Sequence, residues 1–303
     1  MSKKDKTDTA NKHAYLVMAH QRPDLLKKLL ESLDDKRNDI YLHIDKKANE
    51  DMNPSLFSTN ESSLFLTKRI RVNWAGYSQI ECTLNMLEDA VRRGGYSRYH
   101  LITGGSFPLR NQDYIHSFFD NHPTEEFMDI DNPNPERVMY RYLFNESFRA
   151  QGRKARLMWQ IREKYLDIQR RRGADRFKKF NMEHKKGLAY WSITNGMASH
   201  TVANRKLIRD MMKYSECGDE VFMQTIAYNS EYKDGLFDKD GKTHGSLRLT
   251  TWPLEDNGIK RQNHNFTMED KEFILNDKNS LFALKFEGPD GLKLIEEIKK
   301  SNY

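Results

Sequence analysis

Cysteine is scarce in this chain, and long apolar runs are absent from it. Only two cysteines, Cys82 and Cys217, occur among the 303 residues, which is too few for a disulfide framework. Neither has the neighbouring His and Cys residues that a structural zinc site needs. No stretch approaches the roughly 18 apolar residues of a transmembrane helix, and the polar start lacks the apolar core of a signal peptide. These absences predict a cytoplasmic protein. Residues 1–12 are polar and are expected to form a disordered tail.

Several ligand-binding motifs are missing as well. The chain has no G-x-G-x-x-G fingerprint and no P-loop, which argues against a dinucleotide oxidoreductase and an NTPase. It has no aromatic RNP box and no GXXG loop, so a nucleic-acid partner is not expected. Asp129-Ile-Asp131 is a D-x-D, a pattern that often holds a divalent cation against a nucleotide diphosphate. A lone tripeptide in a chain with 44 acids is too little to predict a metal site.

The chain does contain enough apolar residues for a core, and its charge is unevenly distributed. Hydrophobic residues make up 37% of the chain, and the net charge is +6. Segment 149–186 holds 14 Lys and Arg residues against four acids, a local net charge of +10. The helical spacing of Leu157, Ile161, Tyr165 and Ile168 leaves the arginines on other faces. The segment is either one solvated helix face or a basic amphipathic helix for lipid headgroups or a phosphorylated lipid carrier.

Strand-like and helix-like segments alternate in the first third of the chain. Ala14–Ala19 is typical of a buried strand, Pro23 fits the first turn of a helix, and Ile40–Ile44 is the next strand. A strand, a helix and a strand within about 35 residues form a βαβ unit with parallel strands. Further strands are expected over 64–73 and 99–103, and a further helix over 77–92.

This α/β layer resembles a Rossmann-like nucleotide-binding half, whose ligands lie at the carboxyl ends of the strands. Asp45 follows the strand 40–44 at such an end. Its carboxylate either contacts a ribose or a sugar, or caps a turn, and the sequence leaves both interpretations open.

An acidic pair, Asp219 and Glu220, follows a small-residue turn over 217–218 and precedes apolar residues with helix-like spacing. A carboxylate at a helix start lies near the positive end of the helix and can project into a cleft, which suits a general base. In the alternative interpretation Asp219 caps the helix and Glu220 is solvated. The pair alone favours the cap.

Six segments, in order along residues 13–287, resemble the core-2/I-branching β-1,6-N-acetylglucosaminyltransferase family, which includes the peptide O-xylosyltransferases. They are His13-Ala-Tyr-Leu-Val-Met-Ala-His20, Tyr41-Leu-His-Ile-Asp-Lys-Lys47, Val72-Asn-Trp-Ala-Gly-Tyr-Ser78, Leu101-Ile-Thr-Gly-Gly-Ser-Phe-Pro-Leu109, Asp219-Glu220 and Ser280-Leu-Phe-Ala-Leu-Lys-Phe286. The resemblance implies a GT-A-type α/β fold in one domain over 13–303, with 149–186 as a basic helical insertion.

The resemblance also implies an inverting transfer that needs no divalent metal, because basic side chains take over the task of the ion at the diphosphate. Carried over to this chain, Glu220 is the general base and Lys285 is one diphosphate contact. Arg261 is the other, with Lys260 as its rival. Two further residues, Asp45 and Trp74, would lie in the donor nucleotide site.

Three positions depart from the family pattern. Ser106 stands where many members have an acid, Leu188 where a Ser is usual, and Leu284 where Arg or Asn is common. The first two lie in parts expected to border the sugar or the acceptor, so the donor sugar and the acceptor stay open.

The resulting prediction is a bacterial-type cytoplasmic enzyme, peripheral on the inner face of the plasma membrane, that acts in surface polysaccharide synthesis. It would move GlcNAc from UDP-GlcNAc to a glycan or lipid-linked glycan acceptor, without a cofactor. UDP-xylose is the alternative donor. From another class, a non-catalytic protein of the same fold that binds a sugar nucleotide or a polyanion remains open.

Overall fold

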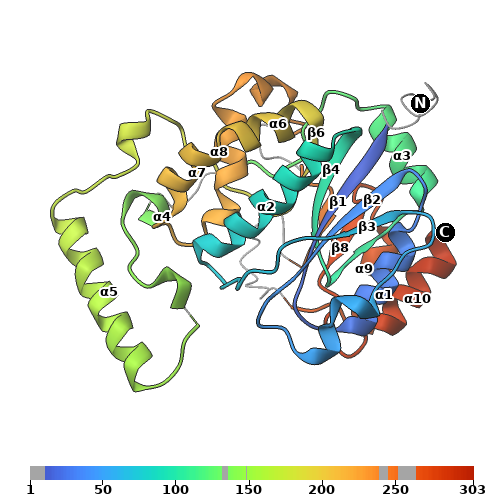
Figure 1. The fold of residues 1–303 in the computed structure, drawn as a ribbon, viewed down its shortest axis with the longest axis horizontal. Helices are drawn as coiled ribbons and strands as arrows, with labels where there is room; N and C mark the ends of the chain where they lie inside the picture. Colours follow the sequence, from blue (N-terminus) through green and yellow to red (C-terminus); the bar gives the residue numbers. More distant parts are fainter. Residues whose placement is uncertain (1–10, 132–135, 148, 239–244, 252–263) are drawn as a thin grey trace, which may run out of the picture.

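The computed structural model describes residues 11–131, 136–147, 149–238, 245–251 and 264–303 (Figure 1). The first ten residues of the predicted tail lie outside these ranges, and the first strand already begins at Lys12. No helix among the described residues is both long enough and apolar enough to cross a membrane.

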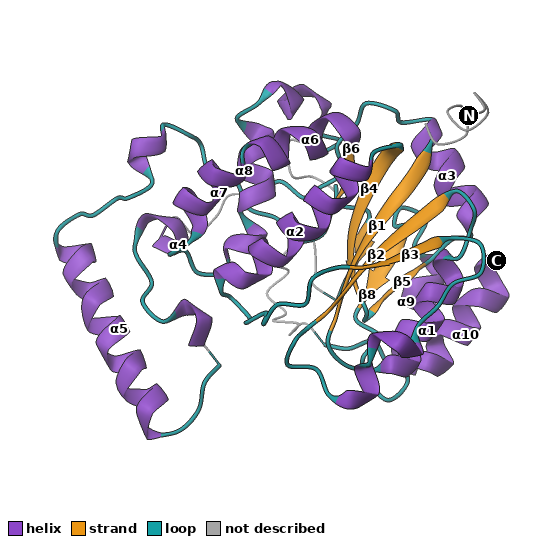
Figure 2. Ribbon diagram, viewed as in Figure 1, coloured by secondary structure: helices purple, strands orange, loops and turns teal. Residues whose placement is uncertain are grey.

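The central sheet has five strands in the order β3-β2-β1-β4-β6 (Figure 2). β1 is flanked by β2 and β4, both parallel to it, β3 is parallel to β2, and β6 is antiparallel to β4. Nearly every residue of β1 and β2 is buried, as expected for parallel strands that are covered on both faces. Their bounds are β1 Lys12–Ala19, β2 Asn38–Ile44, β3 Ser63–Leu66, β4 Tyr96–Thr103 and β6 Ser192–Thr194.

A second sheet of three short strands, in the order β5-β8-β7, continues from the end of β4. It consists of β5 Ser106–Pro108, β8 Phe282–Leu284 and β7 Arg248–Leu249. β5 is antiparallel to β8, and β7 is parallel to it. Through this sheet the C-terminal part of the chain returns to the carboxyl end of β4.

Helices cover both faces of the central sheet (Figure 2). Side chains alternate along β1, so Leu16 packs in the core beneath α2 whereas Val17 packs beneath α1. The helices are α1 Pro23–Leu33, α2 Tyr77–Arg93, α3 Gln112–Asp120, α4 Glu136–Met139, α5 Arg153–Arg171, α6 Asn195–Ala203, α7 Arg205–Met212, α8 Phe222–Tyr228, α9 Lys271–Asn276 and α10 Gly291–Asn302. The predicted α/β class with a Rossmann-like N-terminal half is confirmed.

The strand predicted over 64–73 is wrong beyond Leu66. After this residue the chain crosses the carboxyl end of β2 and leaves the sheet. The Arg69 guanidinium donates hydrogen bonds to the carbonyls of Ile44 and Asp45 at 3.0 and 2.8 Å. The acceptors of these hydrogen bonds lie at the end of β2, outside 64–73, so the local apolar pattern of this stretch could not reveal them.

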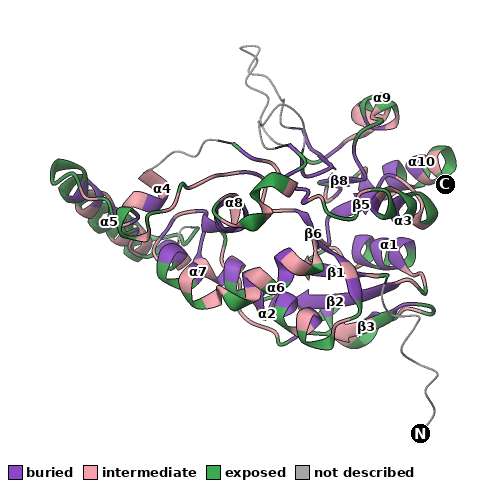
Figure 3. Ribbon diagram, turned by 90° about the horizontal axis from the view of Figure 1, so that it is seen from above, coloured by how far each residue is buried: buried purple, intermediate pink, exposed green. Residues whose placement is uncertain are grey.

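The helix predicted in the basic segment is present as α5, at one edge of the molecule (Figures 1 and 3). Its apolar stripe, however, does not face the protein. The residues buried on α5 are Arg162, Leu166 and Gln169 instead. Polar contacts decide this orientation, because Arg162 pairs with Glu216 and the Gln169 side-chain amide bonds the backbone of Arg141.

Candidate functional site

The acidic pair lies in a single 3₁₀ turn over Gly218–Glu220, just before α8. The turn is preceded by Cys217, whose backbone is left-handed, with φ at 48°. The residue at the N-terminal cap of α8 is Val221, and no side chain caps this helix. The capping role considered for Asp219 is therefore wrong, because this residue lies two positions before the N-terminal cap.

Glu220 is held between two cations. Its Oε2 atom lies 3.0 Å from Nη1 of Arg137, on α4, and 3.7 Å from Nζ of Lys186. The Glu220 side chain is 35% exposed, so a ligand can reach it. The Glu220 carbonyl also accepts a hydrogen bond from the Gly187 amide at 2.9 Å. These contacts fix the carboxylate in direction and leave part of it open to solvent.

The carboxyl of Asp219 faces inward. Its Oδ2 atom accepts a hydrogen bond of 3.1 Å from the Gln79 side chain, whose own oxygen accepts from the Ala75 amide at 2.6 Å. Its Oδ1 atom is out of contact with solvent and receives no hydrogen bond from the described part of the chain. Burial, and then the negative charge of Glu220, raise the pKa of Asp219 to about 7. The two acids therefore have different environments, one ion-paired and one poised to hold a proton.

The loop before α2 connects this acidic turn with the end of β2. Trp74 is 44% exposed, and the Arg149 guanidinium lies 4.3 Å from the centre of its ring. The neighbouring residue Asn73 accepts a hydrogen bond from Nζ of Lys47 at 2.9 Å. Asp45 is buried, and its Oδ1 atom accepts from the Lys47 amide at 2.8 Å. The turn-capping contact considered for Asp45 is thus formed, and Asp45 and Trp74 belong to one connected region.

Glu146 fixes the start of α2, a role that the sequence did not reveal. Its carboxylate accepts hydrogen bonds from the amide and hydroxyl of Ser78, at 2.9 and 2.6 Å, and from the Asn73 side chain at 3.2 Å. A Cβ atom on Gly76 would lie 2.3 Å from Glu146 Oε2. Glycine at position 76 therefore leaves room for the close approach of a distant carboxylate.

Lys285 follows β8 and is exposed. The next residue, Phe286, donates its amide hydrogen to the carbonyl of Gly105 at 2.9 Å, which places the end of β8 beside the loop after β4. The side chain of Glu287 covers Gly105 so closely that a Cβ there would lie 2.6 Å from it. Lys285 thus stands at the carboxyl end of β4.

Tyr190 connects this loop with the acidic turn. Burial raises the pKa of its phenol, and the carboxylates of Asp219 and Glu287 raise it further. The Thr103 side chain, at the end of β4, is a hydrogen-bond partner of this phenol. The Cys217 amide donates a hydrogen bond of 3.2 Å to the Ala75 carbonyl, so the acidic turn lies beside the loop that Lys47 links to the end of β2.

Two predicted residues, Arg261 and its rival Lys260, lie outside the described residues. Among the departures from the family pattern, Ser106 makes a side-chain contact and Leu188 a backbone contact. The hydroxyl of the buried Ser106 bonds the Thr103 amide at 3.2 Å, and the Leu188 carbonyl accepts from the Gln224 side chain at 2.8 Å.

Asp129 of the D-x-D is engaged through its carboxylate, and Asp131 through its backbone. Asp129 Oδ1 accepts from the Ser246 amide at 2.8 Å, and Asp131 exchanges backbone hydrogen bonds with Lys186 at 2.7 and 2.9 Å. Within the described ranges, no group of three or more His, Cys, Asp or Glu residues is arranged to hold a metal ion. Asp131 therefore positions the lysine that approaches Glu220.

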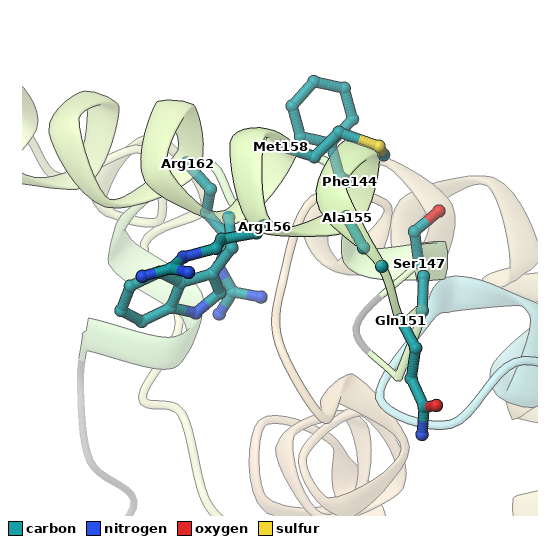
Figure 4. A pocket seen from close by; sticks show the side chains of 10 residues that line it. Phe144, Ser147, Gln151, Ala155, Arg156, Met158 and Arg162 are labelled. Atoms are coloured by element: carbon teal, nitrogen blue, oxygen red, sulfur yellow. The ribbon is translucent and has the colours of Figure 1, made fainter.

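A separate cavity of about 430 Å³ lies between the start of α5 and the segment before it (Figure 4). Its wall includes the aromatic side chains of Phe144 and Trp159 and the guanidinium groups of Arg156 and Arg162. None of the residues predicted for the donor site lines it.

The chain matches a known protein family over most of its length. Residues 13–278 match the family model described as "Branch: Core-2/I-Branching enzyme". The chain belongs to this family. The predicted family and the GT-A-type fold class are confirmed, and the predicted enzyme class, a glycosyltransferase, is that of the family.

Individual relatives are distant. Human beta-1,3-galactosyl-O-glycosyl-glycoprotein beta-1,6-N-acetylglucosaminyltransferase 3 is 26% identical over 102 residues, which cover 32% of this chain and 23% of the human protein. The match thus spans about a quarter of that relative. The solved structure of mouse xyloside xylosyltransferase 1, in its apo form, is similar with a TM-score of 0.33 and 11% identity, over 71% of this chain and 81% of the mouse chain.

Proposed function

We propose that this chain is an inverting glycosyltransferase that moves GlcNAc from UDP-GlcNAc to a hydroxyl of a glycan acceptor. The observation that carries the proposal is the carboxylate of Glu220, which is partly exposed and held by Arg137 and Lys186 beside the loop that joins the carboxyl edge of the sheet, at the end of β2, to α2. Ligands of open α/β sheets bind at this edge. Family membership supports the same chemistry.

In the proposed reaction Glu220 is the general base. It removes the proton of the acceptor hydroxyl while the acceptor oxygen bonds to the anomeric carbon and the bond to UDP breaks on the opposite face. A positioned carboxylate typically accelerates such a step by about 10²–10⁴-fold. The ion pair with Arg137 supports this role because it fixes the direction of the carboxylate before the acceptor arrives.

The departing UDP gathers negative charge, which fixed cations stabilise. We assign one of these cations to Lys285, because its exposed side chain follows β8 at the edge where Thr103 and Gly105 lie. Arg261 is the second, with Lys260 as its rival. With these two cations in place we expect turnover without a divalent metal. Asp45 and Trp74 would contact the nucleotide, on the evidence of their connected loops at the end of β2.

The decisive experiment compares hydrolysis of UDP-GlcNAc and UDP-xylose by the wild type and by Glu220→Gln, in EDTA. Turnover that persists in EDTA and disappears in the variant supports the proposal. Glu231→Gln is the matched control, because Glu231 is exposed and lies on another surface turn. Activity that survives in Glu220→Gln would remove Glu220 from this role. Turnover that depends on Mn²⁺ would indicate instead that Asp129 and Asp131 hold a metal ion.

Thermal unfolding in the presence of each UDP-sugar identifies the donor, since a ligand that binds the folded state raises the melting temperature. Selective stabilisation by UDP-xylose would replace GlcNAc as the donor. Stabilisation by UDP without turnover of either sugar would identify a non-catalytic binding protein instead. We further propose that the enzyme acts in the cytoplasm, in the synthesis of a surface polysaccharide, on a lipid-linked glycan acceptor.

A further inference from the structure

The outward face of α5 carries an apolar stripe that no part of the described structure covers. Leu157, Ile161 and Ile168 are 58%, 44% and 47% exposed, and Tyr165 lies between the last two. These positions are spaced four, four and three residues apart, so they share one face of the helix. Exposed apolar residues are ordinary when single, but a contiguous row of them marks an interaction surface.

The helix cannot bury this stripe by rotating, because another of its faces is fixed to the body. Arg162 pairs with Glu216 and lies 4.9 Å from the ring of Tyr142. Leu166 packs against the tyrosine rings of the segment after α4. The Gln169 side chain both accepts from and donates to the Arg141 backbone, at 2.8 and 3.1 Å. α5 is therefore anchored at one edge of the molecule (Figure 3), and its apolar stripe stays exposed.

Cations border the stripe. Lys154, Lys164 and Arg171 are exposed, and each follows or precedes a stripe residue by three positions, which makes them its neighbours on the helix surface. Arg153–Arg171 contains seven Lys and Arg residues against two acids. An apolar row with a basic border is complementary to a surface that offers both hydrocarbon and negative charge.

We infer that this face of α5 docks on an anionic lipid bilayer, with Leu157, Ile161 and Ile168 inserted at the level of the acyl chains and the bordering cations at the headgroups. A second copy of the chain would bring two basic helices together, and a nucleic acid would leave the apolar row without a counterpart. The inference concerns the location of the protein and is independent of the reaction proposed above.

The test measures cosedimentation of the full chain with vesicles of phosphatidylcholine containing about one-third phosphatidylglycerol, and with pure phosphatidylcholine. We expect binding only to the anionic vesicles. Replacing Leu157, Ile161 and Ile168 together by Ser should weaken partitioning by about tenfold. Replacing Lys154, Lys164 and Arg171 by Gln should weaken it on the order of 100-fold at low salt, and much less at high salt.

Matched controls are Leu56→Ser, Leu66→Ser and Phe273→Ser, which remove equally exposed apolar side chains from other surfaces. They should leave vesicle binding unchanged. Unchanged thermal unfolding of the triple Ser variant, and UDP binding equal to that of the wild type, separate loss of docking from loss of folding or of the donor site. Orientation is read from an environment-sensitive dye on Ile161→Cys and on Asp167→Cys, since both native cysteines are buried. Only the dye at position 161 should shift on binding.

Three outcomes would overturn the inference. One is vesicle binding that the triple Ser variant retains in full. Another is a wild type that ignores anionic vesicles but self-associates through this face, so that the variant becomes a smaller species in sedimentation velocity. The third is tight binding to nucleic acid that depends on the cations and not on the apolar row.

Discussion

The Arg137 guanidinium lies 3.0 Å from the Glu220 carboxylate, although 83 positions separate the two residues in the chain. α4, which carries Arg137, is only a single turn of helix, and its backbone is tied to the acidic turn because the Arg137 carbonyl accepts from the Glu216 amide at 3.1 Å. The arginine and the acid are therefore positioned by the same local contact. This pair orients the carboxylate that we propose as the general base.

Arg137→Gln should lower kcat for UDP-sugar turnover by about tenfold and leave the KM for the donor nearly unchanged, because a charge-assisted hydrogen bond that orients the carboxylate is lost. Arg137→Lys should restore part of the rate. Arg209→Gln, which changes an exposed arginine on α7, is the control. Steady-state kinetics on the three variants test the pair, and an unaltered kcat in Arg137→Gln would show that it has no positioning role.

Asp219→Asn should stabilise the protein above neutral pH. Burial and the charge of Glu220 raise the pKa of Asp219 to about 7. The contribution of this carboxyl to the stability of the fold is therefore fully present below the ordinary pKa of an aspartate, and it is lost as the pH rises through about 7. At about pH 8 the variant should gain about 2–4 kcal/mol in the free energy of unfolding, and the gain should shrink markedly toward about pH 5. Urea unfolding at both values provides the measurement.

The exposed Asp51→Asn is the control and should change little at either pH. Glu220→Gln offers an internal check, because it removes the second cause of the shift and should reduce the pH dependence of wild-type stability. An Asp219→Asn variant whose gain is the same at both pH values would show that the carboxyl does not titrate in this range.

Gly76→Ala should cost about 1–3 kcal/mol, because a Cβ atom would displace the Glu146 carboxylate from Ser78 and Asn73. The carboxylate itself can swing away, so the loss lies in these hydrogen bonds rather than in the collision. In a Glu146→Ala background the bonds are already absent, and the same Gly76→Ala change should cost much less. A double-mutant cycle by urea unfolding measures this coupling, and strict additivity would refute it.

The parts of the fold that the sequence predicts correctly are those with strong periodicity. The apolar run of β1 and the leucine spacing of α1 each have only one good way to be buried. The stretch after Leu66 has a similar local pattern, but side-chain contacts hold it across the end of β2. Arg69 donates to the Ile44 and Asp45 carbonyls, and the Ile70 amide donates to the His43 ring at 3.1 Å. Such tertiary contacts have no local signature.

The same distinction applies to the candidate site. Glu220 and Asp45 lie in segments that the family pattern covers, so their positions could be predicted. Arg137 lies on α4 and Glu146 between α4 and α5, where the sequence has no recognisable motif, and only the folded chain brings them to the acidic turn and to α2. The orientation of α5 could not be predicted from the sequence either. An apolar row is usually the buried face of a helix, whereas here the polar side chains of Arg162 and Gln169 contact the rest of the protein.

A buried histidine cluster should make the protein sensitive to acid. The rings of His13 and His116 stack with centres 3.9 Å apart, and His13 Nδ1 lies 3.1 Å from His100 Nε2. Burial lowers the pKa of His13 and His100 well below the ordinary value and that of His116 to about 4. Folded chains thus keep these rings neutral, whereas unfolded chains protonate them below about pH 6.5.

Stability should therefore fall as the pH decreases from about 6.5 toward 4, and the denaturant midpoint at about pH 5 should lie well below that at about pH 7.5. His116→Gln can still donate to the Asn38 side chain, which the ring contacts at 2.9 Å, and it should flatten this dependence. The exposed His20→Gln should not. Parallel pH profiles for His116→Gln and the wild type would show that another group controls acid unfolding.

Lys285→Gln should reduce kcat/KM for the UDP-sugar by about 10- to 100-fold, because one cation at the departing diphosphate is removed while the acid–base machinery stays intact. Lys278→Gln is a stringent control, since Lys278 is also exposed and lies only a few residues before β8. If Lys285 contacts the diphosphate, the loss should appear for UDP-GlcNAc and UDP-xylose alike, and the affinity for UDP should fall as well. A defect confined to one sugar would instead place Lys285 at the sugar, and equal activity of both lysine variants would remove it from the site.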